Sequence, residues 1–336
     1  MQTFEYTRPK DIEEAIRLGA QAKTAQQGAD VRYIAGGTTV LDLMKLDVEQ
    51  PRRLIDISRL GLDKIEPTTD GGLSIGAMVR NSDLAHHPLI QQRYKVLSEA
   101  ILSGASAQLR NMATTGGNLL QRTRCVYFRD TATGCNKRLS GSGCSAITGE
   151  NRTMALLGAS DHCIATHPTD MGVALVALEG SVHIRGARGE RIVPISDFHL
   201  VPGETPHIEN VMEPGDLITH VTLPPSRRQA QSGYLKLRDR ASYEFALVSA
   251  AVIAEIEGGR FRFARVALGG VGTKPWRSIE AERALTGRPR NEAVIVQAAK
   301  AALANARPQS QNAFKVSLAQ LCIAQALRIV TGMVQP

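Results

Sequence analysis

Residues 33–45 read YIAGGTTVLDLMK, in which two glycines join a short apolar run to a helical pattern. The run at 33–35 predicts a strand, and the apolar spacing over 39–46 predicts a helix. A glycine turn between a strand and a helix can direct free backbone N–H groups at a phosphate. The stretch has neither Gly-x-Gly-x-x-Gly nor a Walker-type Gly-Lys-Ser/Thr, so taken alone it fits a simple tight turn equally well.

A second glycine turn, Thr-Thr-Gly-Gly-Asn at 114–118, follows about eighty residues later. Its hydroxyl and amide side chains can bond a phosphate or the heteroatoms of a ring. Because cofactors are often held in clefts between domains, two such turns predict a dinucleotide bound between two subdomains. Two unrelated turns are the alternative.

The chain around these turns divides into three predicted units. Residues 1–60 contain a helix capped by Asp11 and a strand at 54–57, which predicts a small βαβ-like subdomain. Residues 61–225 form a second subdomain with a long irregular segment at about 122–166. Residues 230–336 combine strands with later helices. The predicted fold class is therefore α+β.

The composition of the chain argues against a membrane-spanning protein and against a nucleic-acid-binding protein. The chain has 336 residues, of which 43% are hydrophobic and 4% aromatic, so we expect several cores built mainly from aliphatic side chains. Its longest apolar stretch, 245–254, is too short to span a bilayer, and we expect the chain to carry no export signal of its own. The net charge of +8 comes from scattered Lys and Arg, so a nucleic-acid-binding module is only a minor alternative.

Four of the five cysteines fall within 39 residues: Cys125, Cys135, Cys144 and Cys163. None forms a Cys-x-x-Cys pair, and a chain with an ample core has little need of disulfides. Four widely spaced thiolates on one irregular segment favour a 4Fe-4S cluster, with zinc and disulfides as the alternatives. Cys322 stands on an apolar helical pattern and is expected to be a buried hydrophobe.

Basic residues surround these cysteines and would offset the negative charge of a thiolate-bound cluster, unless they form a solvated face. They are Arg122, Arg124, Arg129, Lys137, Arg138 and Arg152. His162 and His167 flank Cys163, and we interpret them as structural histidines rather than ligands.

Several motifs together resemble the FAD-binding subunit family of molybdenum hydroxylases, and the resemblance runs over nearly the whole chain. It is carried by Ala35 to Thr38, 108–111, 113–118, 168–171, Leu223-Pro224, 236–246 and 274–277. It implies a two-subdomain, PCMH-type (vanillyl-alcohol-oxidase-like) FAD-binding domain, followed by an α+β domain of the CO dehydrogenase flavoprotein C-terminal type. The cysteine segment is similar to that of the branch containing bacterial periplasmic aldehyde oxidoreductase and 4-hydroxybenzoyl-CoA reductase, and closer to the former.

The resemblance also implies roles for single residues. Asp170 would bond FAD hydroxyls, Ile218 would pack against the flavin ring, and Lys236 would lie near its polar edge. Thr39 and Thr115 stand where many relatives have other residues. The FAD pyrophosphate and ribityl region would be held by Ala35, Gly36, Gly37, Thr38, Thr39, Val40 and Leu41, and by Thr115, Gly116, Gly117 and Asn118.

The implied assembly is a heterotrimer with this chain as its middle subunit. A large molybdenum-cofactor subunit would oxidise an aldehyde, and a small subunit with two 2Fe-2S clusters would pass electrons to FAD and on to an external acceptor. A free-standing flavin and iron-sulfur reductase is the alternative. The resemblance favours a periplasmic location, which this chain would reach by export together with a signal-bearing partner. Without such a partner the chain would stay in the cytoplasm.

Overall fold

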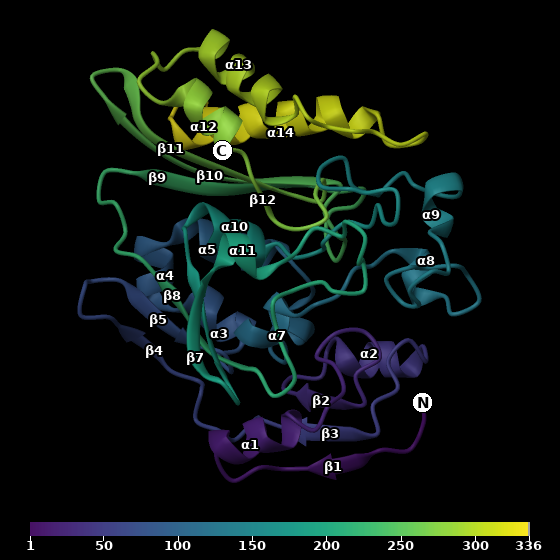
Figure 1. Ribbon diagram of the computed structural model, residues 1–336. Helices are drawn as coiled ribbons and strands as arrows, with labels where there is room; N and C mark the ends of the chain where they lie inside the picture. The colour runs from purple at the N-terminus through teal and green to yellow at the C-terminus, as the bar shows by residue number, and fades with distance from the viewer. Residues whose placement is uncertain (335–336) are drawn as a thin grey trace.

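The N-terminal unit is a three-stranded parallel sheet in the order β1-β3-β2. In the computed structural model, which describes residues 1–334, it lies at the bottom of Figure 1. Asp11 caps the first helix by accepting a hydrogen bond from the Glu14 N–H at 2.8 Å, as the sequence predicts. Its elements are β1 (Glu5–Thr7), α1 (Ile12–Gly19), β2 (Val31–Ile34), α2 (Val40–Lys45) and β3 (Arg53–Asp56).

The middle unit is built on a five-stranded antiparallel sheet in the order β4-β5-β8-β6-β7. Its strands are β4 (Ile65–Pro67), β5 (Leu73–Gly76), β6 (Ser181–Gly186), β7 (Gly189–Pro194) and β8 (Leu217–Leu223). The strands β6 and β7 pair antiparallel as a hairpin.

Helices cover one face of this sheet and share one apolar core with it. The helix Met171–Ala177 is buried at every position, because it is made only of apolar residues and Gly172. The helices are α3 (Asn81–His86), α4 (Pro88–Arg93), α5 (Lys95–Ser103), α6 (Ala107–Arg110), α7 (Thr115–Leu119), α10 (Met171–Ala177) and α11 (Ile195–Phe198).

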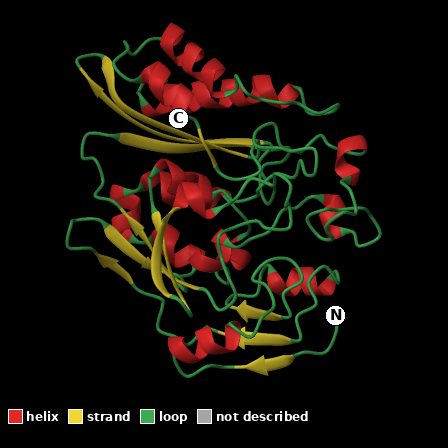
Figure 2. Cartoon of the chain, viewed as in Figure 1, coloured by secondary structure: helices red, strands yellow, loops and turns green. Residues whose placement is uncertain are grey.

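The cysteine segment between α7 and α10 consists mostly of loops, as its lack of periodicity predicts. It contains only two short helices, α8 (Val126–Arg129) and α9 (Ser145–Thr148). Figure 2 shows it as a long run of loop beside the N-terminal and C-terminal units. Leu43 of α2 and Val48 pack into the same apolar cluster as the cysteines, so the segment is docked on the N-terminal unit.

The C-terminal unit is a four-stranded antiparallel sheet in the order β12-β11-β10-β9, with three helices on its outer face (Figure 1). The inner face packs on α5 and α10. Because β10 is covered on both faces, it reads as a continuous apolar run rather than an alternating one. Its elements are β9 (Gln231–Leu237), β10 (Val248–Glu257), β11 (Arg260–Gly269), β12 (Trp276–Arg277), α12 (Ile279–Leu285), α13 (Glu292–Ala302) and α14 (Phe314–Val330).

The α+β class predicted from the sequence is confirmed, since parallel, antiparallel and helical layers occur in separate parts of the chain. Cys322 lies buried on α14 within the C-terminal core, as expected. Within residues 1–334 no helix is both long enough and apolar enough to cross a bilayer.

Candidate functional site

A cleft of about 1350 Å³ opens where the N-terminal unit meets the middle unit, and we call it the central cleft. Its walls come from the junction of β2 and α2, the N-terminal turn of α7, and the segment 209–218. Of the residues that the sequence predicted to hold FAD, the cleft is lined by Ala35, Gly36, Gly37, Thr38, Thr39, Val40, Gly116, Gly117 and Ile218.

The first glycine turn presents unused backbone donors at this cleft. Within residues 1–334, the N–H groups of residues 36–39 donate no hydrogen bond. A side chain on Gly36 would overlap the carbonyl oxygen of Met112, and Gly37 has a φ of +73°, which favours glycine. Because α2 has only six residues, the attraction for an anion rests on the N–H groups of the turn rather than on a helix dipole.

The second glycine turn differs from the first, although the sequence predicted the same chemistry for both. The N–H groups of Thr115 and Gly116 donate to the carbonyls of Val79 (2.9 Å) and Ala77 (2.8 Å). Thr114 Oγ1 accepts from the Gly117 N–H at 3.3 Å. These donors are therefore spent on the fold, and the turn offers the cleft a close-packed glycine surface instead.

Leu41, Thr115 and Asn118 do not line the central cleft. The Thr115 hydroxyl is buried and donates to the Val79 carbonyl at 3.1 Å. The Asn118 side chain accepts a 2.8 Å hydrogen bond from Thr169, which fixes the segment before Asp170 against the second turn. These contacts support the walls of the cleft from behind.

Asp170 and Lys236 lie together, but they line no part of the central cleft. Lys236 Nζ is 2.8 Å from Asp170 Oδ2 and donates to the Ser103 carbonyl at 3.0 Å. The Tyr234 hydroxyl donates to Asp170 Oδ1 at 2.6 Å, and burial together with this carboxylate raises the pKa of Tyr234 well above its usual value. Asp170 borders a separate, smaller cleft beside Cys125 and Phe245.

The four cysteines of the irregular segment are gathered into one apolar cluster with Phe128, Met154 and Ile164. All are free thiols, and Cys135 and Cys144 face each other across an antiparallel bridge. Burial raises the pKa of Cys125 to about 11, and Cys135 and Cys163 add to the rise, so these groups lie within electrostatic range of one another. Within residues 1–334, no three His, Cys, Asp or Glu side chains converge closely enough to hold a metal ion as they stand.

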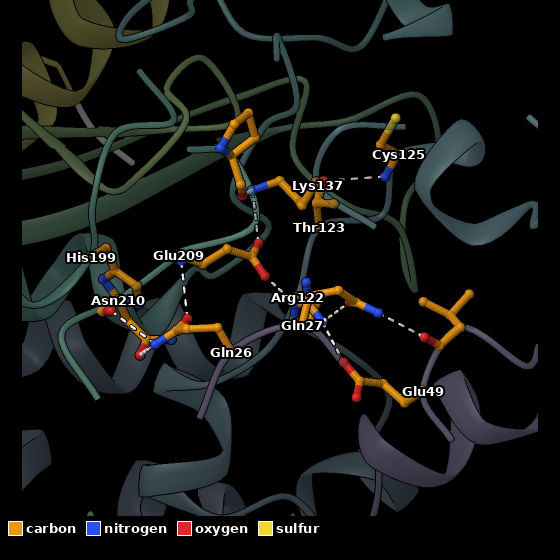
Figure 3. Close-up of polar contacts among 12 residues, drawn as sticks. Gln26, Gln27, Glu49, Arg122, Thr123, Cys125, Lys137, His199, Glu209 and Asn210 are labelled. Atoms are coloured by element: carbon orange, nitrogen blue, oxygen red, sulfur yellow. Dashed lines mark hydrogen bonds and ion pairs between the residues drawn. The ribbon is translucent and has the colours of Figure 1, made fainter. Parts of the chain in front are cut away.

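A buried ion-pair network joins the cysteine segment to residues that line the central cleft. Figure 3 shows Lys137, Glu209, Arg122 and Glu49 of this network. Lys137 Nζ is 2.9 Å from Glu209, Glu209 also contacts Arg122, and Arg122 is 2.5 Å from Glu49. Glu49 in turn accepts hydrogen bonds from Arg32 at 2.9 Å. The members of the network are Lys137, Glu209, Arg122, Glu49 and Arg32.

The network keeps its charges although it is buried. Burial acts to raise the pKa of Glu209, but Arg122 and Lys137 outweigh it and leave that pKa lowered. Burial acts to lower the pKa of Lys137, and the Glu209 carboxylate outweighs it, so the ammonium is retained. Sequence reasoning missed Glu49 and Glu209, because isolated glutamates carry no spacing signal.

The histidines near the cysteines have structural contacts. His167 packs edge-to-face on His199, with ring centroids 4.5 Å apart, and a His199 ring nitrogen is 2.8 Å from the Leu119 carbonyl oxygen. Burial lowers the pKa of His199 to about 4. His162 is half-exposed and lies 2.8 Å from Glu204. These contacts agree with the interpretation of His162 and His167 as structural.

Comparisons with known proteins agree along the whole chain. The family model described as "FAD binding domain in molybdopterin dehydrogenase" matches residues 2–226, and the one described as "CO dehydrogenase flavoprotein C-terminal domain" matches residues 233–330. The chain is 50% identical to the aldehyde oxidoreductase FAD-binding subunit PaoB of Escherichia coli (strain K12), over 97% of this chain and 98% of that one. It is 27% identical to the carbon monoxide dehydrogenase medium chain of Hydrogenophaga pseudoflava, over 91% and 88% of the two chains.

A solved structure shows the same fold. It is a carbon monoxide dehydrogenase from Hydrogenophaga pseudoflava which lacks the Mo-pyranopterin moiety of the molybdenum cofactor. It aligns with a TM-score of 0.76 at 26% identity and covers 98% of both chains. The similarity therefore extends over all three units.

Proposed function

Because this chain belongs to the family of FAD-binding medium subunits of molybdenum hydroxylases, we propose that it is the electron-transfer subunit of an aldehyde oxidoreductase and carries FAD and one 4Fe-4S cluster. As a member of this family it is an oxidoreductase subunit with an FAD-binding domain. Our proposal adds three points to this: the substrate of the complex is an aldehyde, the chain holds a 4Fe-4S cluster, and electrons pass through the chain to an external acceptor.

The central cleft fits FAD. The free N–H groups of residues 36–39 would bind the pyrophosphate, and the absence of a side chain at Gly36 lets the turn lie against Met112. Ile218 would give an apolar contact to a ring, since it lines the same cleft. When bound, FAD exchanges electrons singly or in pairs.

The other residues that the sequence predicted to bind FAD do not line the central cleft, so we propose a different role for them. Leu41, Thr115 and Asn118 would hold the two turns in position rather than touch the cofactor. Asp170 and Lys236 would reach FAD hydroxyls or the flavin edge only by exchanging part of the ion pair that they form with each other. Their contact with FAD therefore remains a prediction.

Cys125, Cys135, Cys144 and Cys163 would hold the 4Fe-4S cluster. They are free thiols in one apolar cluster, three of them buried and Cys144 partly buried, and they lie on a segment with little regular structure. Around a single zinc ion, ligand sulfurs converge to metal distances of ~2.3 Å, whereas in a cube each thiolate binds its own iron corner. The spread of the four thiols over 39 residues of one segment, with no Cys-x-x-Cys pair, supports the cube, which exchanges one electron and would also order the segment.

The proposed assembly is a complex with a large molybdenum-cofactor subunit and a small subunit with two 2Fe-2S clusters. The names "FAD-binding subunit" and "medium chain" of the relatives support partners of this kind. Aldehyde oxidation would take place on the large subunit, and this chain would pass the electrons to an external acceptor. We propose the periplasm as its location, reached by export with a signal-bearing partner.

One observation carries this proposal: the cysteine group and the cleft with free amide donors lie on either side of a single buried ion-pair network. Co-expression with the two partner subunits and affinity purification through this chain tests it. We expect a coloured complex that contains all three chains, flavin and iron. A stable monomer that holds flavin and iron but captures neither partner would instead support the free-standing reductase.

A further inference from the structure

The buried ion-pair network consists of five charged side chains that contact one another in series. Its side chains are between 3% (Glu49) and 20% (Arg32) exposed, so none of them is a freely solvated surface charge. The charges alternate in sign along the series of contacts and leave one net positive charge. Buried charges are costly unless they are paired, so each member depends on its neighbours.

One end of the network faces the cysteine group. Lys137 follows Cys135 by two positions, and burial raises the pKa of Cys163 while the Lys137 ammonium opposes that rise. Its other partners are Glu209 at 2.9 Å and the Pro206 carbonyl at 3.1 Å. The cysteine group therefore has a buried positive charge beside it whose strength depends on Glu209.

The other end borders the central cleft. Arg32, Glu49, Arg122 and Glu209 all line it. Arg122 occupies the middle of the network, donates to the Gln27 side chain at 2.7 Å and lies 4.6 Å from the Phe128 ring centroid. One set of paired charges is thus shared between the cleft and the cysteine segment.

We propose that this network sets the reduction potential of the redox group held by the four cysteines, with Lys137 stabilising its reduced form and Glu209 moderating Lys137. The inference rests on the proposed function, because it requires a cluster on these thiolates. Reduction adds one electron to a group that already carries net negative charge, and a fixed positive charge in a poorly solvated site favours that step.

Two substitutions, one that removes a positive charge and one that removes a negative charge, distinguish electrostatic tuning from a purely structural role of the network. Lys137→Met removes the positive charge and should lower the reduction potential of the cluster. Glu209→Gln leaves Lys137 and Arg122 less neutralised and should raise it. A brace would respond to both changes in the same direction, by loosening the segment.

The test is an EPR-monitored redox titration of the purified three-subunit complex, with iron content measured on the same samples. We expect each substitution to change the one-electron equilibrium constant about tenfold in opposite directions, which corresponds to ~59 mV. Lys137→Arg, which keeps the charge, should stay near the unsubstituted protein. Arg185→Met is the matched control, because Arg185 also bridges two units, to Glu13 at 2.6 Å, but at an exposed site.

The outcomes separate this inference from the proposed function. Shifts of the same sign, no shift, or loss of iron from both variants would overturn the tuning role while leaving the cluster assignment in place. An unsubstituted complex with no cluster signal and no iron bound to this chain would overturn the cluster assignment, and the tuning role with it.

Discussion

Gly36 illustrates how single residues shape the central cleft. The backbone there approaches Met112 so closely that a methyl group cannot fit between them. The sequence predicted that this turn would bind a phosphate, and the free N–H groups of 36–39 agree with that prediction. The sequence could not show that the donors of Thr115 and Gly116 are consumed by Val79 and Ala77, since those partners lie more than thirty residues away.

Gly36→Ala should therefore reduce FAD binding. The added methyl group must displace either the turn or residue 112, which we expect to cost about 1–3 kcal/mol of folding stability and most of the bound flavin. Flavin absorbance per chain and thermal unfolding measure the two effects. Gly71→Ala is the control, because it strains a left-handed glycine with no neighbour within 4 Å. Full flavin occupancy in Gly36→Ala would contradict the role of this turn.

His199 gives a pH-dependent prediction at the same scale. Burial lowers its pKa to about 4, whereas an unfolded histidine has a pKa near ~6.5. The unfolded state therefore takes up the proton first, and stability should be lost as the pH falls from about 6.5 to about 4, by up to roughly 3 kcal/mol. Urea unfolding across this range should show the loss, and His199→Gln should lessen it. An equal acid loss in that variant would assign it to other groups.

The cysteine segment shows which features of secondary structure could be predicted from the sequence and which could not. Its lack of periodicity and its four cysteines correctly predicted a long irregular region. The docking of the segment on Leu43 and Val48, and its link to Glu209 through Lys137, could not be predicted, because these contacts join parts of the chain far apart in sequence. The start of the helix after Asp11 was predicted correctly because the signal of a cap is local.

Cys135→Ser should remove or impair the cluster and loosen the segment 122–166. Because this region has little regular secondary structure, we expect faster proteolysis within it and a lower Tm. Limited proteolysis followed by mass spectrometry locates the cuts, and Cys322→Ser, in the C-terminal core, is the control. If turnover persists while only stability drops, the cluster is a brace and not an exit route for electrons.

Lys315 ties helix α14 to this segment. Its buried Nζ donates to the carbonyls of Thr153 and Met154 at 3.0 Å each and of Gly270 at 2.5 Å. Lys315→Met would remove these three charge-assisted hydrogen bonds and leave the Gly270 carbonyl without its donor, which we expect to cost roughly 3 kcal/mol. Chemical denaturation measures the change, with the exposed Lys95→Met as control. A difference below about 0.5 kcal/mol between the two variants would show that the contacts are not needed.

Across the whole molecule, the N-terminal and middle units form the central cleft, and the cysteine segment is docked on the N-terminal unit beside it. The α+β class and the grouping of the cysteines could be predicted from the sequence. The ion-pair network between the sites could not, because Glu49 and Glu209 are 160 positions apart and meet only through Arg122. The ion pair between Asp170 and Lys236 could not be predicted either, because the two residues are 66 positions apart.

The most direct test of the account is the flavin and iron content of this chain, purified under anaerobic conditions within its three-subunit complex and then separated from its partners. We predict one FAD and about four iron atoms on the chain, with the iron lost when Cys135 is replaced. A colourless, iron-free chain from a complex that still oxidises aldehydes would contradict it.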